Sequence, residues 1–301
     1  MAGGQPPERE GRRGERQSDG ERRQPAGARE RQAGVLGQPR VARAELRRLW
    51  GKSRVSPEPR SAVYELAPAV VVASLLVALV LVPIGGRSPA WPVGNDAIVL
   101  VGLLALGRFA ITLSAWDTGG GFGLMGAGRD LTFAVAVEAV LLLVLVLVAL
   151  PTGSTDLVAP SGAGEWSEPA HWAAALAFGL VVLAETGRQP VDNPDTHLEL
   201  TMVHEGPLLE YAGRDLAYLQ WAAAARHWLV LVVGAQVFFP HAANPWWQLA
   251  ALPLVLAVLC AGLAVVETLV AKMRVLLVPR LLGVGAVAAL LGIATHLAGA
   301  S

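Results

Sequence analysis

The sequence predicts an all-α protein, a polytopic transmembrane helix bundle of about seven spans joined by large cytoplasmic loops. Hydrophobic residues make up 53% of the 301 positions, and charged residues make up only 16%. Residues 1–60 hold 15 of the 24 Lys and Arg, which leaves nine for the remaining 241 positions. Apolar runs at 66–83, 131–150 and 249–266 approach the roughly 20 residues that cross a hydrocarbon core as a helix. A soluble fold does not fit this pattern.

The N-terminal part is polar. Residues 1–40 contain almost no large apolar side chains, so we expect an Arg-rich disordered segment that cannot offset its ordering entropy. Residues 41–60 are expected to form a basic cytoplasmic juxtamembrane segment. Apolar and basic side chains are interleaved there: Val41, Leu46, Leu49 and Trp50 with Arg43, Arg47 and Arg48. This suits a helix lying on the membrane surface, and a short solvated helix is the alternative.

Residues 61–301 are expected to form the transmembrane domain. Its spans are predicted at about 65–83, 97–115, 131–150, 170–185, 226–239, 247–271 and 281–299. The fifth span is short, and its start can also be placed nearer Leu219. Lys and Arg near the ends of spans are retained in the cytoplasm, which sets the orientation.

The basic residues between spans fall almost entirely on one side. With the N-terminus inside, the loops around 116–130, 186–225 and 272–280 are cytoplasmic. They contain Arg129, Arg188, Arg214, Lys272, Arg274 and Arg280, whereas only Arg87 lies in an outside loop. The C-terminus is therefore expected outside.

Two short patterns are weak signals for a cofactor. Gly121, Gly123 and Gly126 match the dinucleotide fingerprint, but they follow a membrane helix and not a strand, so we interpret them as a turn between two spans. The acids and histidines at 197–205 lack the spacing of a zinc site. The single cysteine, Cys260, is too few for an intrachain disulfide or an iron–sulfur cluster. We expect no metal or redox cofactor in this chain.

The segment 184–215 is acidic. Its seven carboxylates stand against two bases and are Glu185, Asp192, Asp195, Glu199, Glu205, Glu210 and Asp215. Read as a helix from Pro194, Asp195 and Glu199 stack one turn apart beside an apolar stripe, which indicates a half-inserted helix. A solvated acidic loop is the alternative.

Charges within the spans are a second signal, because each costs several kcal/mol unless it is paired or hydrated. Arg108, Glu138 and Glu267 lie in the cytoplasmic half of their spans, and Glu185 lies at a similar depth. The set favours a hydrated polar path, and static ion pairs are the alternative. Arg108 and Glu138 are expected to be partners because their spans are consecutive.

Three segments carry a family resemblance. The first reads ETGRQPVDNP at 185–194, THLELTM at 196–202, Glu205 and LEYAG at 209–213. The second reads DTG at 117–119, FGLMG at 122–126 and RD at 129–130, and the third reads AKMR at 271–274 and VP at 278–279. In order and spacing they resemble the membrane subunit of formate hydrogenlyase and hydrogenase-4 complexes, a branch of the NADH dehydrogenase subunit 1 family of respiratory complex I.

The resemblance covers about residues 45–299 and departs from the family at the start. The family begins with a transmembrane helix, whereas residues 1–40 are polar and Arg-rich, so seven spans stand where eight are expected. A misassigned start codon, a frame error or a shortened subunit each accounts for this difference.

The resemblance implies a non-redox subunit of a membrane-bound oxidoreductase, not catalytic alone, in the bacterial cytoplasmic membrane. Its partners would be hydrogenase-like large and small subunits carrying nickel–iron and iron–sulfur centres, other complex I-like membrane subunits and the lipid bilayer, and no nucleic acid. The proton or sodium path candidates are Arg108, Glu138, Glu185, Asp192, Asp195, Glu199, Glu205, Glu210 and Glu267. The candidates for docking the peripheral redox arm are Asp117, Arg129, Asp130, Arg188, Arg214, Lys272 and Arg274.

Three other functions stay open. A subunit 1 of an NADH–quinone oxidoreductase would add a quinone-site role, and a structural anchor would carry the charges as static pairs. A secondary transporter would show internal repeats or matched broken spans, and the sequence has neither.

Overall fold

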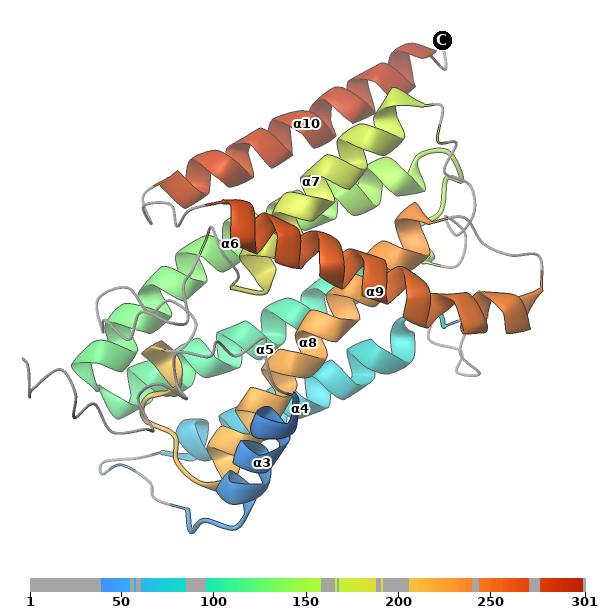
Figure 1. Ribbon diagram of the computed structural model, residues 1–301. Coiled ribbons are helices and arrows are strands. Elements are labelled where there is room, and N and C mark those ends of the chain that lie inside the picture. The colour runs from blue at the N-terminus through green and yellow to red at the C-terminus, as the bar shows by residue number, and fades with distance from the viewer. Residues whose placement is uncertain are drawn as a thin grey trace, which may run out of the picture. The chain divides into compact units, whose positions relative to one another are not determined.

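The computed structural model describes residues 39–54, 57, 61–84, 96–157, 166, 168–187, 191, 206–239, 244–270 and 277–299. The chain divides into two compact units, residues 1–45 and 46–301. Helices dominate the described residues (Figure 1). They are α3 (Pro39–Trp50), α4 (Ala62–Leu81), α5 (Ala97–Thr118), α6 (Gly121–Ala149), α7 (Pro169–Glu185), the short 3₁₀ helix η1 (Gly206–Leu208), α8 (Arg214–Phe238), α9 (Pro245–Leu269) and α10 (Val278–Gly299).

The predicted all-α, multi-span bundle is confirmed. Six helices, α4, α5, α6, α8, α9 and α10, are long and apolar enough to cross a membrane. The 17-residue α7 is equally apolar but shorter, and at a rise of about 1.5 Å per residue it is near the lower limit for a span. The protein is a multi-pass membrane protein, with α7 as the element on which a count of seven depends.

The predicted loop at 116–130 is wrong, because these residues are almost entirely helical. Only Gly119 and Gly120 separate α5 from α6, and Gly119 adopts a φ of +67° that other residues rarely take. Gly126, later in α6, serves close packing. A Cβ on Gly126 would lie 2.8 Å from the Cα of Gly206. Glycine here permits α6 to touch η1, and it does not end the helix.

The fifth predicted span also begins earlier than its principal placement at 226. Helix α8 starts at Arg214 and runs for 25 residues, so the alternative start near Leu219 was closer. The Ala-rich stretch 222–225 favours continuation of the helix. As a result, Arg226 lies in the middle of a membrane helix.

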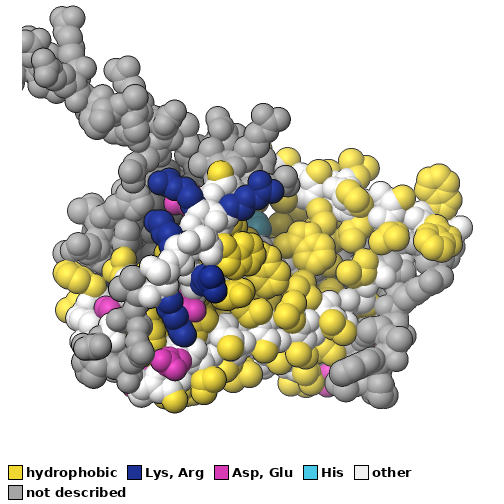
Figure 2. Space-filling view, turned by 90° about the horizontal axis from the view of Figure 1, so that it is seen from below, with side chains coloured by type: hydrophobic (Ala, Val, Ile, Leu, Met, Phe, Trp, Pro, Cys, Tyr) yellow, Lys and Arg dark blue, Asp and Glu magenta, His cyan; other side chains and the backbone are white. Residues whose placement is uncertain are grey.

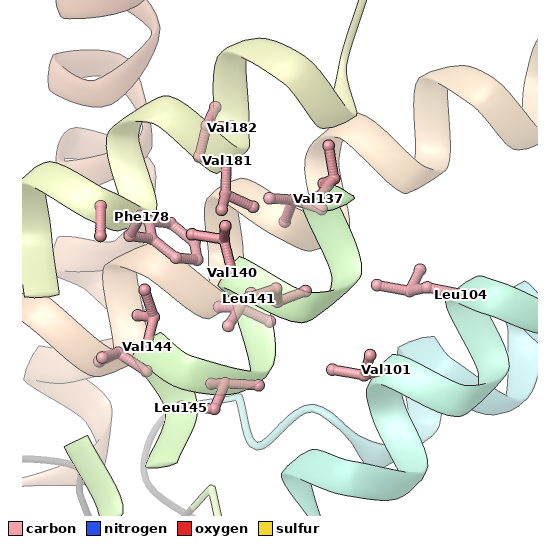
Figure 3. Packing of buried hydrophobic residues seen from close by; sticks show 14 of the residues in the cluster. Val101, Leu104, Val137, Val140, Leu141, Val144, Leu145, Phe178, Val181 and Val182 are labelled. Carbon is pink, nitrogen blue, oxygen red and sulfur yellow. The ribbon is translucent and has the colours of Figure 1, made fainter. Parts of the chain in front are cut away.

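Helix α6 is at the centre of the packing in unit 46–301. Figure 3 shows Val101 and Leu104 of α5 pointing toward Leu141 of α6, with the α7 residues Phe178 and Val181 on the far side. Helix α10 packs along both α6 and α7, and α4 packs on α5 and α8.

Helix α9 is the least enclosed of these elements. It packs against α8, and none of the residues in its apolar window is buried. Its exposed side chains include Leu254, Val258 and Val265. In a lipid bilayer this apolar surface can face the lipid directly and needs no other protein element to cover it, because lipid tails are as apolar as leucine.

Candidate functional site

A buried carboxylate at the end of α7 joins two arginines from other helices. The Nη2 atom of Arg108 donates to Oε2 of Glu185 and also to its backbone carbonyl oxygen at 3.4 Å. The Nε atom of Arg226 donates to Oε1 of Glu185 at 2.6 Å. Relative exposure is only 7% for Arg108 and 6% for Glu185. The cluster therefore ties α5, α7 and α8 together inside the bundle.

Two more carboxylates lie near this cluster on α6. Asp130 is buried, and Glu138 is half-buried. The negative charges of both act on Arg108. The buried Oε1 atom of Glu138 has no hydrogen-bond partner among the residues that the structure describes. The site thus combines two guanidinium groups with the carboxyl groups of Glu185 and Asp130, and the charge of Glu138 acts on it from further along α6.

The expected pair of Arg108 with Glu138 is not the ion pair that forms. Because α6 begins directly after Gly120, Asp130 stands at nearly the same depth as Arg108 when both are counted from the α5–α6 connection. Glu138 lies eight residues further along α6, which is about 12 Å deeper. The pairing was misplaced because the start of the span was placed ten residues too late.

A cavity of about 170 Å³ opens beside the cluster. Its polar walls come from Ser74, Arg108, Asp130, Glu185, Thr186, Arg226 and His227. Its apolar walls include Val71, Leu75, Leu103 and Leu219. The volume is large enough for several water molecules, and the charged walls offer them hydrogen-bond partners.

Two arginine nitrogens in this cluster have hydrogen-bonding capacity left. Within the described part of the chain, Nη1 of Arg108 and Nη2 of Arg226 are buried and have no acceptor. A buried donor without an acceptor costs about 1–3 kcal/mol, so such groups favour water or a mobile proton acceptor nearby. Chemically, the arrangement can hold water and exchange protons between carboxyl groups.

A second polar contact lies apart from the cavity, where the residues before α8 meet α4 and α5. The rings of Tyr64 and Tyr211 stack with centroids 4.6 Å apart. The Tyr64 hydroxyl donates to the carbonyl oxygen of Glu210 at 2.8 Å, and the Tyr211 hydroxyl donates to the carbonyl oxygen of Tyr64 at 3.2 Å. Burial raises the pKa of Tyr211 to about 12, so this hydroxyl stays protonated. The contact holds the residues just before α8 against α4.

The structure brings together only part of the predicted path. Arg108 and Glu185 line the cavity, and Glu138 lies beyond its walls but close enough for its charge to act on both arginines, whereas Glu210 lies against the α5–α6 connection, close to Gly120. Glu267 is half-buried on α9 and does not line the cavity. Four of the predicted acids lie outside the described residues: Asp192, Asp195, Glu199 and Glu205.

The predicted docking residues have varied environments. Asp117 accepts hydrogen bonds from the backbone N–H of Ser61 at 3.0 Å and from its hydroxyl at 2.7 Å, at the start of α4. Asp130 lines the cavity, Arg129 is half-buried and Arg214 is exposed at the first position of α8. Arg188, Lys272 and Arg274 lie outside the described residues.

Arg226 is the member of the ion-pair cluster that sequence reasoning missed. It stood at the edge of the fifth predicted span, where a basic residue is ordinary. The alternative start of that span near Leu219 contained the signal, since it places Arg226 at membrane depth.

Metal ligands are a separate question from the charge cluster. In the described ranges, no group of three or more His, Cys, Asp or Glu residues is placed to hold a metal ion.

Comparison with known proteins gives a consistent family. The profile described as NADH dehydrogenase matches residues 30–295. The chain is 33% identical to hydrogenase-4 component C of Escherichia coli (strain K12) over 199 residues, which covers 65% of this chain and 62% of that protein. It is 29% identical to formate hydrogenlyase subunit 4 of the same organism, over 79% of this chain and 80% of that protein.

A solved structure shares the fold. A chain of the membrane-bound sulfane sulfur reductase, an archaeal respiratory membrane complex, superposes with a TM-score of 0.69 at 19% sequence identity. The superposition covers 86% of this chain and 87% of that one. At this identity the likeness concerns the helical architecture.

Proposed function

Because the chain belongs to the NADH dehydrogenase subunit 1 family and is similar to the hydrogenase-4 and formate hydrogenlyase proteins within it, we propose that it couples a peripheral redox reaction to ion translocation. In this proposal it is the non-redox membrane subunit of a hydrogenase-4-like or formate hydrogenlyase-like oxidoreductase. It docks the redox arm and carries protons or sodium ions through its charged interior.

The observation that supports this role is the Arg108–Glu185–Arg226 cluster beside a cavity with polar walls. Buried ionisable groups in membrane helices mark ion pathways when they face a cavity and not lipid. Glu138 is the strongest candidate for a proton carrier, because it is half-buried and its charge acts on both arginines. The acids at 192, 195, 199, 205, 210 and 267 extend the proposed path.

The docking role rests on the family and on the chain's charge distribution. The names of the relatives point to complexes with hydrogenase subunits, which would carry the nickel–iron and iron–sulfur centres. Arg188, Arg214, Lys272 and Arg274 lie in segments that the positive-inside rule assigns to the cytoplasm of a bacterial inner membrane, whereas Arg129 and Asp130 lie within α6.

A structural anchor is the second candidate, and one observation favours it. Both carboxylate oxygens of Glu185 are occupied by arginine donors, as in a static buried ion-pair network. The two functions differ in what happens when Glu138 is neutralised, since Glu138 makes none of these ion pairs.

We expect the Glu138→Gln complex to assemble and to keep its redox turnover, while the number of ions translocated per electron falls severalfold. The measurement is ion uptake by the purified complex in proteoliposomes, normalised to its redox rate. Glu168→Gln is the matched control, because Glu168 lies at the other end of the bundle and its side chain makes no cap hydrogen bond to α7.

The alternatives predict different results. An assembled Glu138→Gln complex that translocates ions at the wild-type ratio removes Glu138 from the path and favours the anchor. Loss of assembly would show that Glu138 is needed for the fold and would favour the structural anchor.

A further inference from the structure

The end of α3 and the turn after it form a basic surface that the proposed function does not use. Arg47, Arg48 and Lys52 are exposed and make no ion pair with any residue that the structure describes. The fourth base, Arg54, is held by Asp215 of α8 at 2.5 Å. We call the first three residues the basic edge.

The basic edge is held in place by packing against α8. Leu49 is buried, and the ring of Trp50 meets Tyr218 edge-on with centroids 6.0 Å apart. Gly213 has a φ of +61°, and a Cβ there would lie 2.5 Å from the carbonyl oxygen of Ser53, so the turn and the start of α8 are in close contact. The charges therefore stand at a fixed position near the beginning of a membrane helix.

Apolar and aromatic surface lies directly beside these charges. Trp50 and Tyr218 are 44% and 42% exposed. Figure 2, which looks at the molecule from the lower end of Figure 1, shows Lys and Arg side chains beside a broad hydrophobic surface. Trp and Tyr side chains that lie between charged groups and a hydrophobic surface are typical of the membrane–water interface.

We propose that the basic edge binds the phosphate headgroup of an anionic phospholipid, whose acyl chains lie on the apolar surface next to Trp50 and Tyr218. Arginine presents a planar fork of donors that matches phosphate oxygens, and lysine adds a compact charge. Basic groups next to a span are attracted to anionic lipid by an amount that corresponds to about fivefold in affinity per charge. An acidic protein would use the charges but not the adjoining apolar surface.

The experiment measures lipid selectivity of the full-length protein. The protein is purified in mild detergent with equal amounts of phosphatidylglycerol and phosphatidylcholine, and the lipid that it retains is quantified by mass spectrometry. We expect the wild type to be enriched in phosphatidylglycerol. We expect the triple variant R47Q/R48Q/K52Q to lose this enrichment by up to about 100-fold, and R47K/R48K to keep most of it.

Two controls separate the basic edge from net charge and from folding. The variant R12Q/R13Q/R16Q removes the same number of charges near the N-terminus and should retain wild-type selectivity. Thermal unfolding of the triple variant should match the wild type, because all three side chains are exposed.

Two results would overturn the proposal. One is a loss of selectivity in the N-terminal control as large as that in the triple variant, and the other is unchanged selectivity in the triple variant. Unchanged lipid selectivity with loss of a partner subunit would assign the surface to an acidic protein. None of these results bears on the Glu138 experiment.

Discussion

Glu185 is the residue on which the buried charge cluster depends, because one carboxylate serves two guanidinium groups from different helices. We expect Glu185→Gln to destabilise the protein by about 3 kcal/mol or more, since it leaves both arginines buried without their counter-charge. Thermal unfolding in detergent measures this effect, and Glu168→Gln at the N-cap of the same helix is the matched control.

Glu185 and Arg226 also allow a direct measurement of the energy of their ion pair. The effects of Glu185→Gln and Arg226→Gln should not add, because the two side chains share one ion pair. An interaction energy between about 0.5 and 3 kcal/mol is expected for residues in direct contact. Strict additivity would show that the pair contributes little to the folded state.

At this scale the sequence predicted which charges lie inside the helix bundle better than it predicted which charges pair with one another. Arg108, Glu138 and Glu185 could be found because charges in apolar spans are expensive wherever they point. Their pairing depends on helix register and rotation, which hydropathy does not contain. Arg226 was missed for a related reason, since a basic residue at a predicted span edge looks like an ordinary interfacial anchor.

Among the elements, α6 shows how glycine can be misread. Gly126 sits against Gly206 of η1, and a Cβ there would come within 2.8 Å of backbone. We expect Gly126→Ala to destabilise the protein by about 1–3 kcal/mol through overpacking. Thermal unfolding again measures this, with Gly128→Ala as the control two residues further along α6.

The control variant Gly128→Ala has its own expected effect on the stability of the protein. A Cβ on Gly128 would meet nothing within 4 Å, and alanine is the better helix former by about 1 kcal/mol. Gly128→Ala should therefore be neutral or stabilising. If both variants behaved alike, the contact between α6 and η1 would not constrain position 126.

Hydropathy predicted that each span exists, but it did not predict the residues at which the spans begin and end. The apolar runs located every one of the long helices, because about 20 apolar residues have few alternatives to a membrane helix. A glycine-rich stretch, however, serves equally well for a turn or for close helix packing, and one sequence does not distinguish these uses. The start of α6 was misplaced for this reason.

For the whole molecule, the testable property is the orientation in the membrane. In a Cys260→Ala background, we expect cysteine at Gly121 to be unreactive toward an impermeant reagent outside intact cells and cysteine at Thr155 to react. Gly121 has open space around it, and Thr155 is exposed near the opposite ends of α5 and α6. Labelling of Gly121→Cys from outside would reverse the topology and the proposed side of docking.

The short connection between α5 and α6 also has a consequence for how the chain is made. Arg108 leaves the ribosome 77 residues before Glu185 and 118 before Arg226, so its eventual partners do not exist when α5 reaches the insertion machinery. Asp130 follows after only 22 residues, and a hairpin closed by Gly119 and Gly120 brings it to the depth of Arg108. At about 5–20 residues per second, this shortens the time that the arginine waits for a counter-charge from many seconds to a few. We therefore expect α5 and α6 to enter the lipid together, as one helical hairpin.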